Sequence, residues 1–259
     1  MSDPILEVRK LNKSFGPVHV LHDVDFNVYP GEVTALVGDN GAGKSTLVKC
    51  IAGIYGIDSG EIRFQGTPVT MNDPRVPTSL GIEFVYQDLA LADNLDITQN
   101  MFLGREETNG KVFLADGLME KKARAALESL DVRTVSSVRQ QVASLSGGQR
   151  QTVAIAKAVL WNSKVVFLDE PTAALGVAQT KQVLDLVRRL ADQGRGVVLI
   201  SHNMNDVMSV ADRVAALYLG HVAAEVKTKE SSTAQIVELI TSGHSDGLGL
   251  SAQTANESI

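Results

Sequence analysis

Apolar and polar residues alternate over the first part of the chain, from residue 5 to residue 37. Alternation with a period of two is typical of strands that bury one face. Turn residues at Phe15-Gly16-Pro17 and at Pro30-Gly31 interrupt the alternation. The pattern therefore predicts an N-terminal antiparallel β section, with strands at 5–8, 24–28 and 33–37.

Helical and strand-like patterns follow one another in the rest of the chain. The pattern is helical from Leu95 to about Gln140, and it predicts a further helix from Gln149 to Trp161. The continuous apolar run Val165–Leu168 is typical of a strand buried on both faces. The other expected elements are helices at 44–54, 177–193 and 203–211 and strands at 60–65, 82–86, 197–200 and 213–219.

The order of these elements predicts an α/β fold. Strands and helices alternate after residue 165, which favours a core of parallel strands. A helical insert at about 95–160 interrupts this core. We expect a single domain over 5–242. The residues from 243 to 259 are rich in Ser, Gly, Asn and Asp, which predicts a disordered tail.

Composition narrows the classes of function. Hydrophobic residues make up 44% of the 259 positions and charged residues 21%, which is ordinary for a globular protein. The net charge of −6 argues against a nucleic-acid partner. The single cysteine, Cys50, excludes a disulfide within the chain and is expected to be buried. We expect neither a signal peptide nor a transmembrane helix, so a membrane role requires a partner.

A glycine-rich motif lies between an apolar strand and a helix. Its sequence, GDNGAGKS, matches G-x-x-x-x-G-K-[ST]. The glycines let backbone N–H groups surround phosphate oxygens, while Lys44 reaches the β- and γ-phosphates and Ser45 binds Mg²⁺. The alternative is a glycine-rich turn without a ligand. The expected nucleotide-binding residues are Gly38, Asn40, Gly41, Ala42, Gly43, Lys44, Ser45 and Thr46.

Two carboxylates follow the buried strand at 165–168. Ligands of open α/β sheets bind at the carboxyl ends of the strands. Asp169 is therefore a candidate ligand for Mg²⁺, and Glu170 is a candidate for polarising an attacking water. The alternative is a pair of solvated acids at a strand end.

Three further side chains are candidates by position. His202, which follows Ser201 at the end of the strand 197–200, is expected to contact the γ-phosphate. Gln87 follows the strand 82–86 and is a candidate ligand for Mg²⁺ or the attacking water. An amide at a strand end more often contacts no ligand, and this alternative stays open. Phe15 is expected to stack on a base or to pack in the core. Surface or packing roles are expected for Trp161, His19, His22, His221 and His244.

The segment Leu145-Ser-Gly-Gly-Gln149 offers half of an anion site. A hydroxyl and two glycines precede a helix, whose first N–H groups and dipole favour an anion. The segment contains no lysine, nucleophile or set of metal ligands. If it binds a phosphate, another element must hold the rest of the nucleotide.

These motifs, in their order along the chain, resemble the ATP-binding subunit of an ABC transporter. The resemblance runs from about residue 5 to residue 242, and LSGGQ is its most specific element. It implies a P-loop NTPase core with a helical signature subdomain. It also implies a head-to-tail dimer, in which the signature of one chain closes over the γ-phosphate bound at Lys44 of the other. The signature residues are Ser146, Gly147, Gly148 and Gln149.

The resemblance also assigns roles to single residues. Phe15 would stack on adenine, Glu170 would act as general base and His202 would sense the γ-phosphate. The Gln87 loop would couple the ATP site to an integral-membrane permease. The subunit would then lie at the cytoplasmic face of the cell membrane, with ATP and Mg²⁺ as its cofactors.

A finer resemblance is to importers of monosaccharides of the ribose, xylose or fructose type. It rests on Val85–Leu91, Phe102–Glu106 and Ser201–Met204. Such a complex includes an extracytoplasmic sugar-binding protein. Many members carry two ATPase units, whereas this chain has one, so a second copy or a paralogue would complete the dimer. Gly176 stands where the wider family usually has Asp, which removes one side chain expected to contact the partner.

Two other functions stay open at this point. One is a soluble ABC ATPase that acts on ribosomes or DNA, although the acidic charge and the short separation between the phosphate loop and the signature disfavour it. The other is a transporter ATPase for a solute that is not a sugar. The sequence does not identify the sugar.

Overall fold

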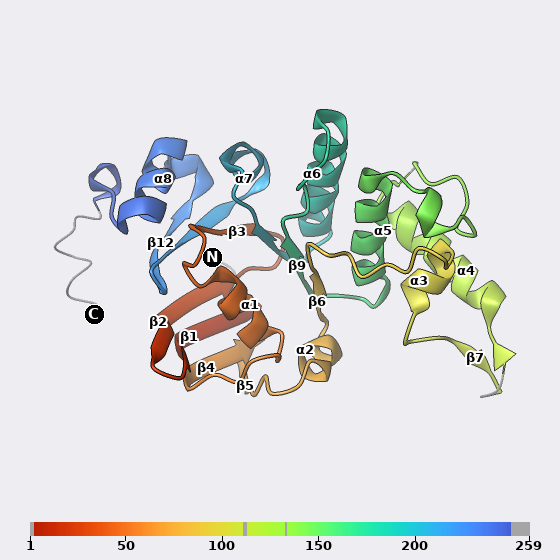
Figure 1. Cartoon of the computed structure of the whole chain (residues 1–259), viewed down its shortest axis with the longest axis horizontal. Helices are drawn as coiled ribbons and strands as arrows, with labels where there is room; N and C mark the ends of the chain where they lie inside the picture. The colour runs from red at the N-terminus through yellow and green to blue at the C-terminus, as the bar shows by residue number, and fades with distance from the viewer. Residues whose placement is uncertain (1–2, 111–112, 133, 250–259) are drawn as a thin grey trace.

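The computed structural model describes residues 3–110, 113–132 and 134–249 (Figure 1). A central sheet lies between an antiparallel sheet on one side and helices α6, α7 and α8 on the other. A group formed by α3, α4 and α5 lies at one end of the molecule (Figure 1). The fold class predicted from the sequence, an α/β core with an N-terminal antiparallel section, is confirmed.

The antiparallel sheet has the strand order β2-β1-β4-β5. Every second residue at the start of β1 is buried, including Leu6 and Val8, as the alternation predicts. The third predicted strand, 33–37, belongs instead to the central sheet. The bounds are β1 Leu6–Phe15, β2 Val18–Val28, β4 Ser59–Phe64 and β5 Thr67–Val69.

The central sheet has the order β12-β11-β3-β10-β9-β6. The five strands from β11 to β6 run parallel, and β12 pairs antiparallel with β11. The carboxyl ends of β3, β10, β9 and β6 therefore meet at one edge. The bounds are β3 Val33–Gly38, β6 Ile82–Val85, β9 Val165–Asp169, β10 Gly196–Ile200, β11 Arg213–Tyr218 and β12 His221–Lys227.

Both faces of the central sheet are covered. Phe167 contributes to a core with α1 (Lys44–Ile51) and the antiparallel sheet. Val166 and Leu168 contribute to the opposite core, with the helices on the other face. Residues 165–168 are at most 1% exposed, which accounts for their continuous apolar run. Cys50 of α1 is buried as predicted, and burial raises the pKa of its thiol to about 11.

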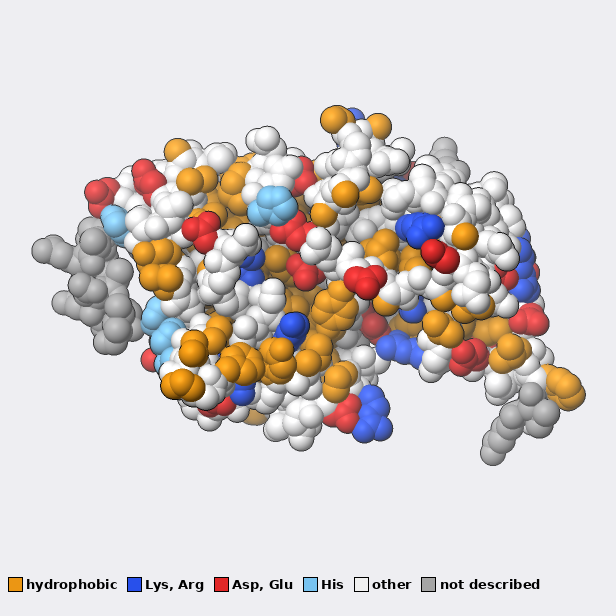
Figure 2. Space-filling model, viewed as in Figure 1, with side chains coloured by type: hydrophobic (Ala, Val, Ile, Leu, Met, Phe, Trp, Pro, Cys, Tyr) orange, Lys and Arg blue, Asp and Glu red, His pale blue; other side chains and the backbone are white. Residues whose placement is uncertain are grey.

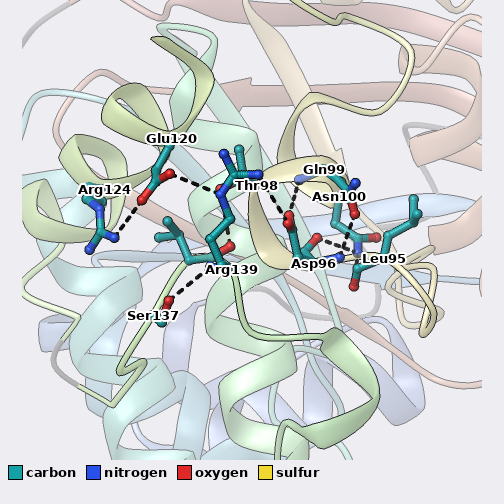
Figure 3. A network of polar contacts seen from close by, with 10 residues as sticks. Leu95, Asp96, Thr98, Gln99, Asn100, Glu120, Arg124, Ser137 and Arg139 are labelled. Atoms are coloured by element: carbon teal, nitrogen blue, oxygen red, sulfur yellow. Dashed lines mark hydrogen bonds and ion pairs between the residues drawn. The ribbon is translucent and has the colours of Figure 1, made fainter. Parts of the chain in front are cut away.

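The segment 95–140 is less helical than its pattern predicts. It contains α3 (Ile97–Phe102) and α4 (Asp116–Ser129), separated by the hairpin β7 (Thr108–Asn109) and β8 (Phe113–Leu114). Specific side-chain bonds hold the irregular stretch after α4. Arg139 pairs with Glu120 of α4 and with Asp96, the N-cap of α3 (Figure 3).

The remaining helices pack on the central sheet or against α3 and α4. Trp161, at the end of α5, contacts the ring of Phe102, which is the packing role predicted for it. The sequence did not predict α2, α8 or β12. The bounds are α2 Arg75–Leu80, α5 Gly147–Leu160, α6 Val177–Asp192, α7 Met204–Val210 and α8 Thr233–Ser242.

The end of the described chain differs from the predicted disordered tail. Residues 246–248 form a 3-10 turn, and Ser245 is 1% exposed with its hydroxyl bonded to Glu238 of α8 at 2.7 Å. Residues 250–259, also predicted to be disordered, lie outside the described residues. Among the described residues, no helix has the length and apolar character needed to cross a membrane.

Candidate functional site

The phosphate loop joins β3 to α1 and depends on its glycines. A Cβ at Gly38 would lie 2.4 Å from the carbonyl oxygen of Leu217, and one at Gly43 would lie 2.7 Å from the side chain of Leu21. Gly43 also has a φ of 108°, which L side chains rarely adopt. No side chain caps α1, so its first N–H groups are available to an anion.

Lys44 folds back over this loop. Its Nζ donates hydrogen bonds to the carbonyl oxygens of Gly38 at 2.6 Å and Asp39 at 3.0 Å. Burial lowers the pKa of Lys44, and attraction to Glu170, Asp39 and Asp169 partly offsets this effect. The amine therefore lies within the field of both carboxylates that follow β9.

Asp169 and Glu170 lie at the carboxyl edge of the central sheet, beside the end of β10. Asp169 is opposite Ile200 of β10. Burial, followed by repulsion from Glu170, raises the pKa of Asp169. Acidic and histidine side chains gather in the middle of this face, below α7 (Figure 2). A cation here would relieve the cost of the buried negative charge.

Glu170 has an unusual backbone and a specific partner. Its φ is +48°, and its N–H donates to the carbonyl of Ile200 at 2.9 Å. Its Oε1 lies 2.8 Å from Nδ1 of His202. The contact is a hydrogen bond from the imidazole to the carboxylate in the tautomer that carries the proton on Nδ1. The His202 side chain is 78% exposed and that of Glu170 is 16% exposed, so the imidazole lies between the carboxylate and solvent.

Gln87 reaches the same edge from β6. It lies two residues beyond the end of that strand and is exposed. Its neighbour Tyr86 has a raised pKa, first because of burial and then because of the charge on Asp169. Residues 86–96 join β6 to α3 and are called the Gln87 loop below. The loop begins near Asp169, because β6 and β9 pair in parallel.

The oxygen donors at this edge fit Mg²⁺. Ser45 supplies a hydroxyl, Gln87 an amide oxygen and Asp169 a carboxylate. Mg²⁺ commonly binds one or two carboxylates and completes its shell with water and phosphate oxygens. The described residues contain no group of three or more His, Cys, Asp or Glu side chains arranged for a metal ion.

Phe15 is the last residue of β1 and lies beside Tyr55, which follows the end of α1. Its side chain is 42% exposed and packs edge-on against Tyr55, with ring centroids 5.1 Å apart. The Nζ of Lys13 lies 5.3 Å from the ring centroid. An exposed ring in this setting is suited to stacking on a base.

The signature lies on a different element from the phosphate loop. α5 begins at Gly147, two residues earlier than predicted, and lies on the far side of β6 and β9 from α1 (Figure 1). The hydroxyl of Ser146 accepts from the N–H of Gln149 at 3.4 Å, and the Gln149 side chain accepts from the N–H of Ser146 at 2.9 Å. Ser146 therefore caps its own helix through a capping box with Gln149.

Gln179 of α6 connects the signature helix to Gly176. Its Oε1 accepts from the N–H of Gly176 at 3.2 Å. A Cβ at Gly148 would lie 3.1 Å from the Gln179 side chain, so only glycine fits there without displacement. Sequence reasoning did not identify Gln179. Its position in the sequence could have indicated this role. Gln179 lies three residues after Gly176, the N-cap of α6, and a glutamine side chain there can reach back to the N–H of the cap.

Three of the remaining histidines stack beside the phosphate loop. The rings of His22 and His221 are parallel, with centroids 4.6 Å apart, and the centroid of His19 is 3.8 Å from that of His22. The turn next to His221 contacts the loop, because the N–H of Gly220 donates to the carbonyl of Ala42 at 3.0 Å. Burial, then repulsion from the other two rings, lowers the pKa of His22.

This stack predicts a loss of stability in mild acid. A histidine whose pKa is lower in the folded state takes up its proton more readily when unfolded. The free energy of unfolding therefore falls as the pH drops below the ordinary histidine value of about 6.5. The Tm should fall between pH 7 and pH 5, and less so in His22→Gln. His244→Gln is the control. An equal fall in Tm for His22→Gln and the wild type would contradict the prediction.

Together, the loop, the strand edge and the separate signature define a phosphate-loop nucleotide-binding domain. Residues 21–173 match the family described as ABC transporter, which is more than half of the chain. The chain belongs to this family of ATP-binding subunits.

Two curated relatives match almost end to end. The chain is 46% identical over 242 residues to the xylose/arabinose import ATP-binding protein XylG of Sulfolobus acidocaldarius, covering 93% of this chain and 95% of the relative. It is 46% identical over 245 residues to the fructose import ATP-binding protein FrcA of Rhizobium meliloti, covering 92% and 94%.

A solved structure supports the same assignment. The ATP-binding cassette MJ0796 was determined as a dimer in a post-hydrolysis state bound to ADP and Pi. It matches with a TM-score of 0.70 and 26% identity, covering 86% of this chain and 98% of that chain. Cassettes of this family therefore bind and hydrolyse ATP, and form dimers.

Proposed function

We propose that this chain is the ATP-hydrolysing subunit of a sugar importer and works as a head-to-tail dimer with a second copy or a paralogue. One observation supports the dimer. One edge of the central sheet gathers Lys44, Asp169, Glu170 and Gln87, whereas Ser146 begins a helix beyond β6 and β9. The single cassette would span 5–242. The names of the two relatives support a sugar as the transported solute.

Each residue has a proposed task in hydrolysis. Lys44 and the N–H groups at the start of α1 bind phosphate oxygens, and Phe15 stacks on the adenine. Mg²⁺, when bound by Ser45, Asp169 and Gln87, would neutralise charge on the phosphate oxygens.

The Glu170–His202 pair supplies the proton chemistry. Glu170 is held at 2.8 Å by Nδ1 of His202 and accepts a proton from the attacking water. His202 in turn senses the γ-phosphate from its exposed position. Ser146, Gly147, Gly148 and Gln149 of the partner subunit would close the other side of the site.

The complex would include two further proteins. The exposed Gln87 loop would contact an integral-membrane permease, and an extracytoplasmic sugar-binding protein would deliver the sugar. The subunit would lie at the cytoplasmic face of the membrane and bind no nucleic acid. A soluble ABC ATPase that acts on ribosomes or DNA is the competing outcome.

Uptake of labelled monosaccharides tests the proposal. A strain lacking this gene should lose uptake of one or more of xylose, arabinose, fructose and ribose. The wild-type gene and the control Lys121→Met, on the exposed face of α4, should restore uptake, whereas Lys44→Met should not. Unchanged uptake of every sugar in the deletion strain, or purification of the chain with ribosomes, would exclude sugar import.

A further inference from the structure

The Gln87 loop is fixed at its far end by a buried asparagine. Asn100 of α3 is fully buried, and its amide accepts from the N–H of Ala92 at 2.7 Å. The same amide donates to the carbonyl of Ala92 at 3.0 Å. It also donates to the carbonyls of Leu95 at 3.3 Å and Asp96 at 3.0 Å (Figure 3). A buried amide with its bonds satisfied holds one backbone arrangement. Residues 92–96 therefore have a defined position relative to α3.

Residues 93–96 lie along residues 141–143, which shortly precede the signature. The N–H of Val142 donates to the carbonyl of Leu95 at 3.1 Å, and the N–H of Ala143 donates to that of Asp93 at 3.0 Å. Asp96 forms an isolated β-bridge with Gln141. The two segments are therefore paired through their backbones, immediately before Leu145 and Ser146.

Arg150 adds a side-chain connection between them. It lies in the first turns of α5, one residue after the signature, and its Nη1 is 2.8 Å from Oδ1 of Asp93. The same guanidinium donates to the carbonyls of Leu145 and Ala143, both at 3.3 Å. One planar fork therefore holds the Gln87 loop and the start of the signature together.

In the proposed dimer, the Gln87 loop and the signature of one chain belong to different ATP sites. Building on the shared-site dimer proposed above, Gln87 belongs to the ATP site of its own chain, whereas Ser146 closes the site of the partner. We propose that the Asp93–Arg150 ion pair makes the Gln87 loop and the signature segment move together. Occupancy of one ATP site thereby changes how the chain closes the other site. In this proposal Asp93 and Arg150 act as positioning residues, through their contact with each other and with the backbone before the signature.

Cooperativity of ATP hydrolysis by the purified full chain measures this coupling. The wild type should show a sigmoidal dependence on Mg-ATP, with a Hill coefficient approaching about 2, the limit for two sites. Asp93→Asn should reduce the coefficient to about 1. The Kd of the monomer for ATP should not change, nor should the Tm, because exposed ion pairs contribute little stability. A merely structural role would lower the Tm or the affinity instead.

Two further variants make the test specific. Asp93→Glu keeps the charge and should restore the cooperativity. Asp88→Asn removes a carboxylate from the same loop, where it accepts only from the N–H of Ala90 among the described residues, and should behave as the wild type. The inference fails if Asp93→Asn remains cooperative or if Asp93→Glu is as defective as Asp93→Asn. A monomeric wild type without cooperativity would overturn the shared-site proposal and, with it, this coupling.

Discussion

Replacing Glu170 by Gln should reduce ATP hydrolysis by about 10²- to 10⁴-fold, the usual contribution of a positioned general base. The amide is isosteric with the carboxylate but does not accept the proton of the attacking water. ATP binding should persist, because Lys44 and the start of α1 are unchanged. The measurements are steady-state phosphate release and, separately, equilibrium binding of ATP.

The same variant should accumulate as an ATP-bound dimer, which light scattering after gel filtration detects. Glu83→Gln provides a matched control, because Glu83 lies in β6 and pairs with Arg105 away from the phosphate loop. It should hydrolyse ATP like the wild type. Hydrolysis by Glu170→Gln at the wild-type rate would rule out Glu170 as general base.

Ser146→Ala should lower hydrolysis by about 10²-fold, the cost typical of removing one hydrogen bond to a reacting oxyanion. The isolated chain should bind ATP with unchanged affinity, because its own phosphate loop is intact. The dimer should close poorly. Ser146 also caps α5, so the variant should lose about 1 kcal/mol of stability.

The chain contains a control for the loss of the cap. Ser232 caps α8 through the same reciprocal bonds, in this case with Gln235. Ser232→Ala should therefore lose a similar free energy of unfolding and keep its ATPase activity. Equal losses of activity in the two variants would show that Ser146 acts only through its helix. Loss of ATP binding by monomeric Ser146→Ala would contradict the shared site.

The elements predicted best are those whose local pattern agrees with their final environment. Residues 165–168 are apolar throughout and are buried on both faces of the sheet. β12 was missed because its residues are half-buried, with no clear alternation. The segment 95–140 has a helical pattern, but the hairpin β7–β8 and the bonds of Arg139 replace part of the helix. Tertiary contacts override local preference in such segments.

The candidate site was predictable where a motif imposes geometry. The glycines and Lys44 indicated a phosphate loop because the glycines let the backbone approach an anion closely and the lysine adds a positive charge there. The bond between Glu170 and His202 depends on the positive φ at Glu170 and on the pairing of β9 with β10. Neither is a local property of the sequence. The contact of Asp93 with Arg150 spans distant segments and was equally inaccessible.

The two bonds from Lys44 to the carbonyls of Gly38 and Asp39 have a consequence for the speed of nucleotide exchange. These carbonyls would compete with a phosphate for the amine of Lys44. An incoming phosphate would have to replace their hydrogen bonds to the amine. The same two bonds would support the shape of the loop without a nucleotide, because they tie the amine to the backbone of the loop itself. In the proposed ATP site, part of the attraction between Lys44 and phosphate would therefore be offset, which would weaken affinity and favour rapid release of the spent nucleotide.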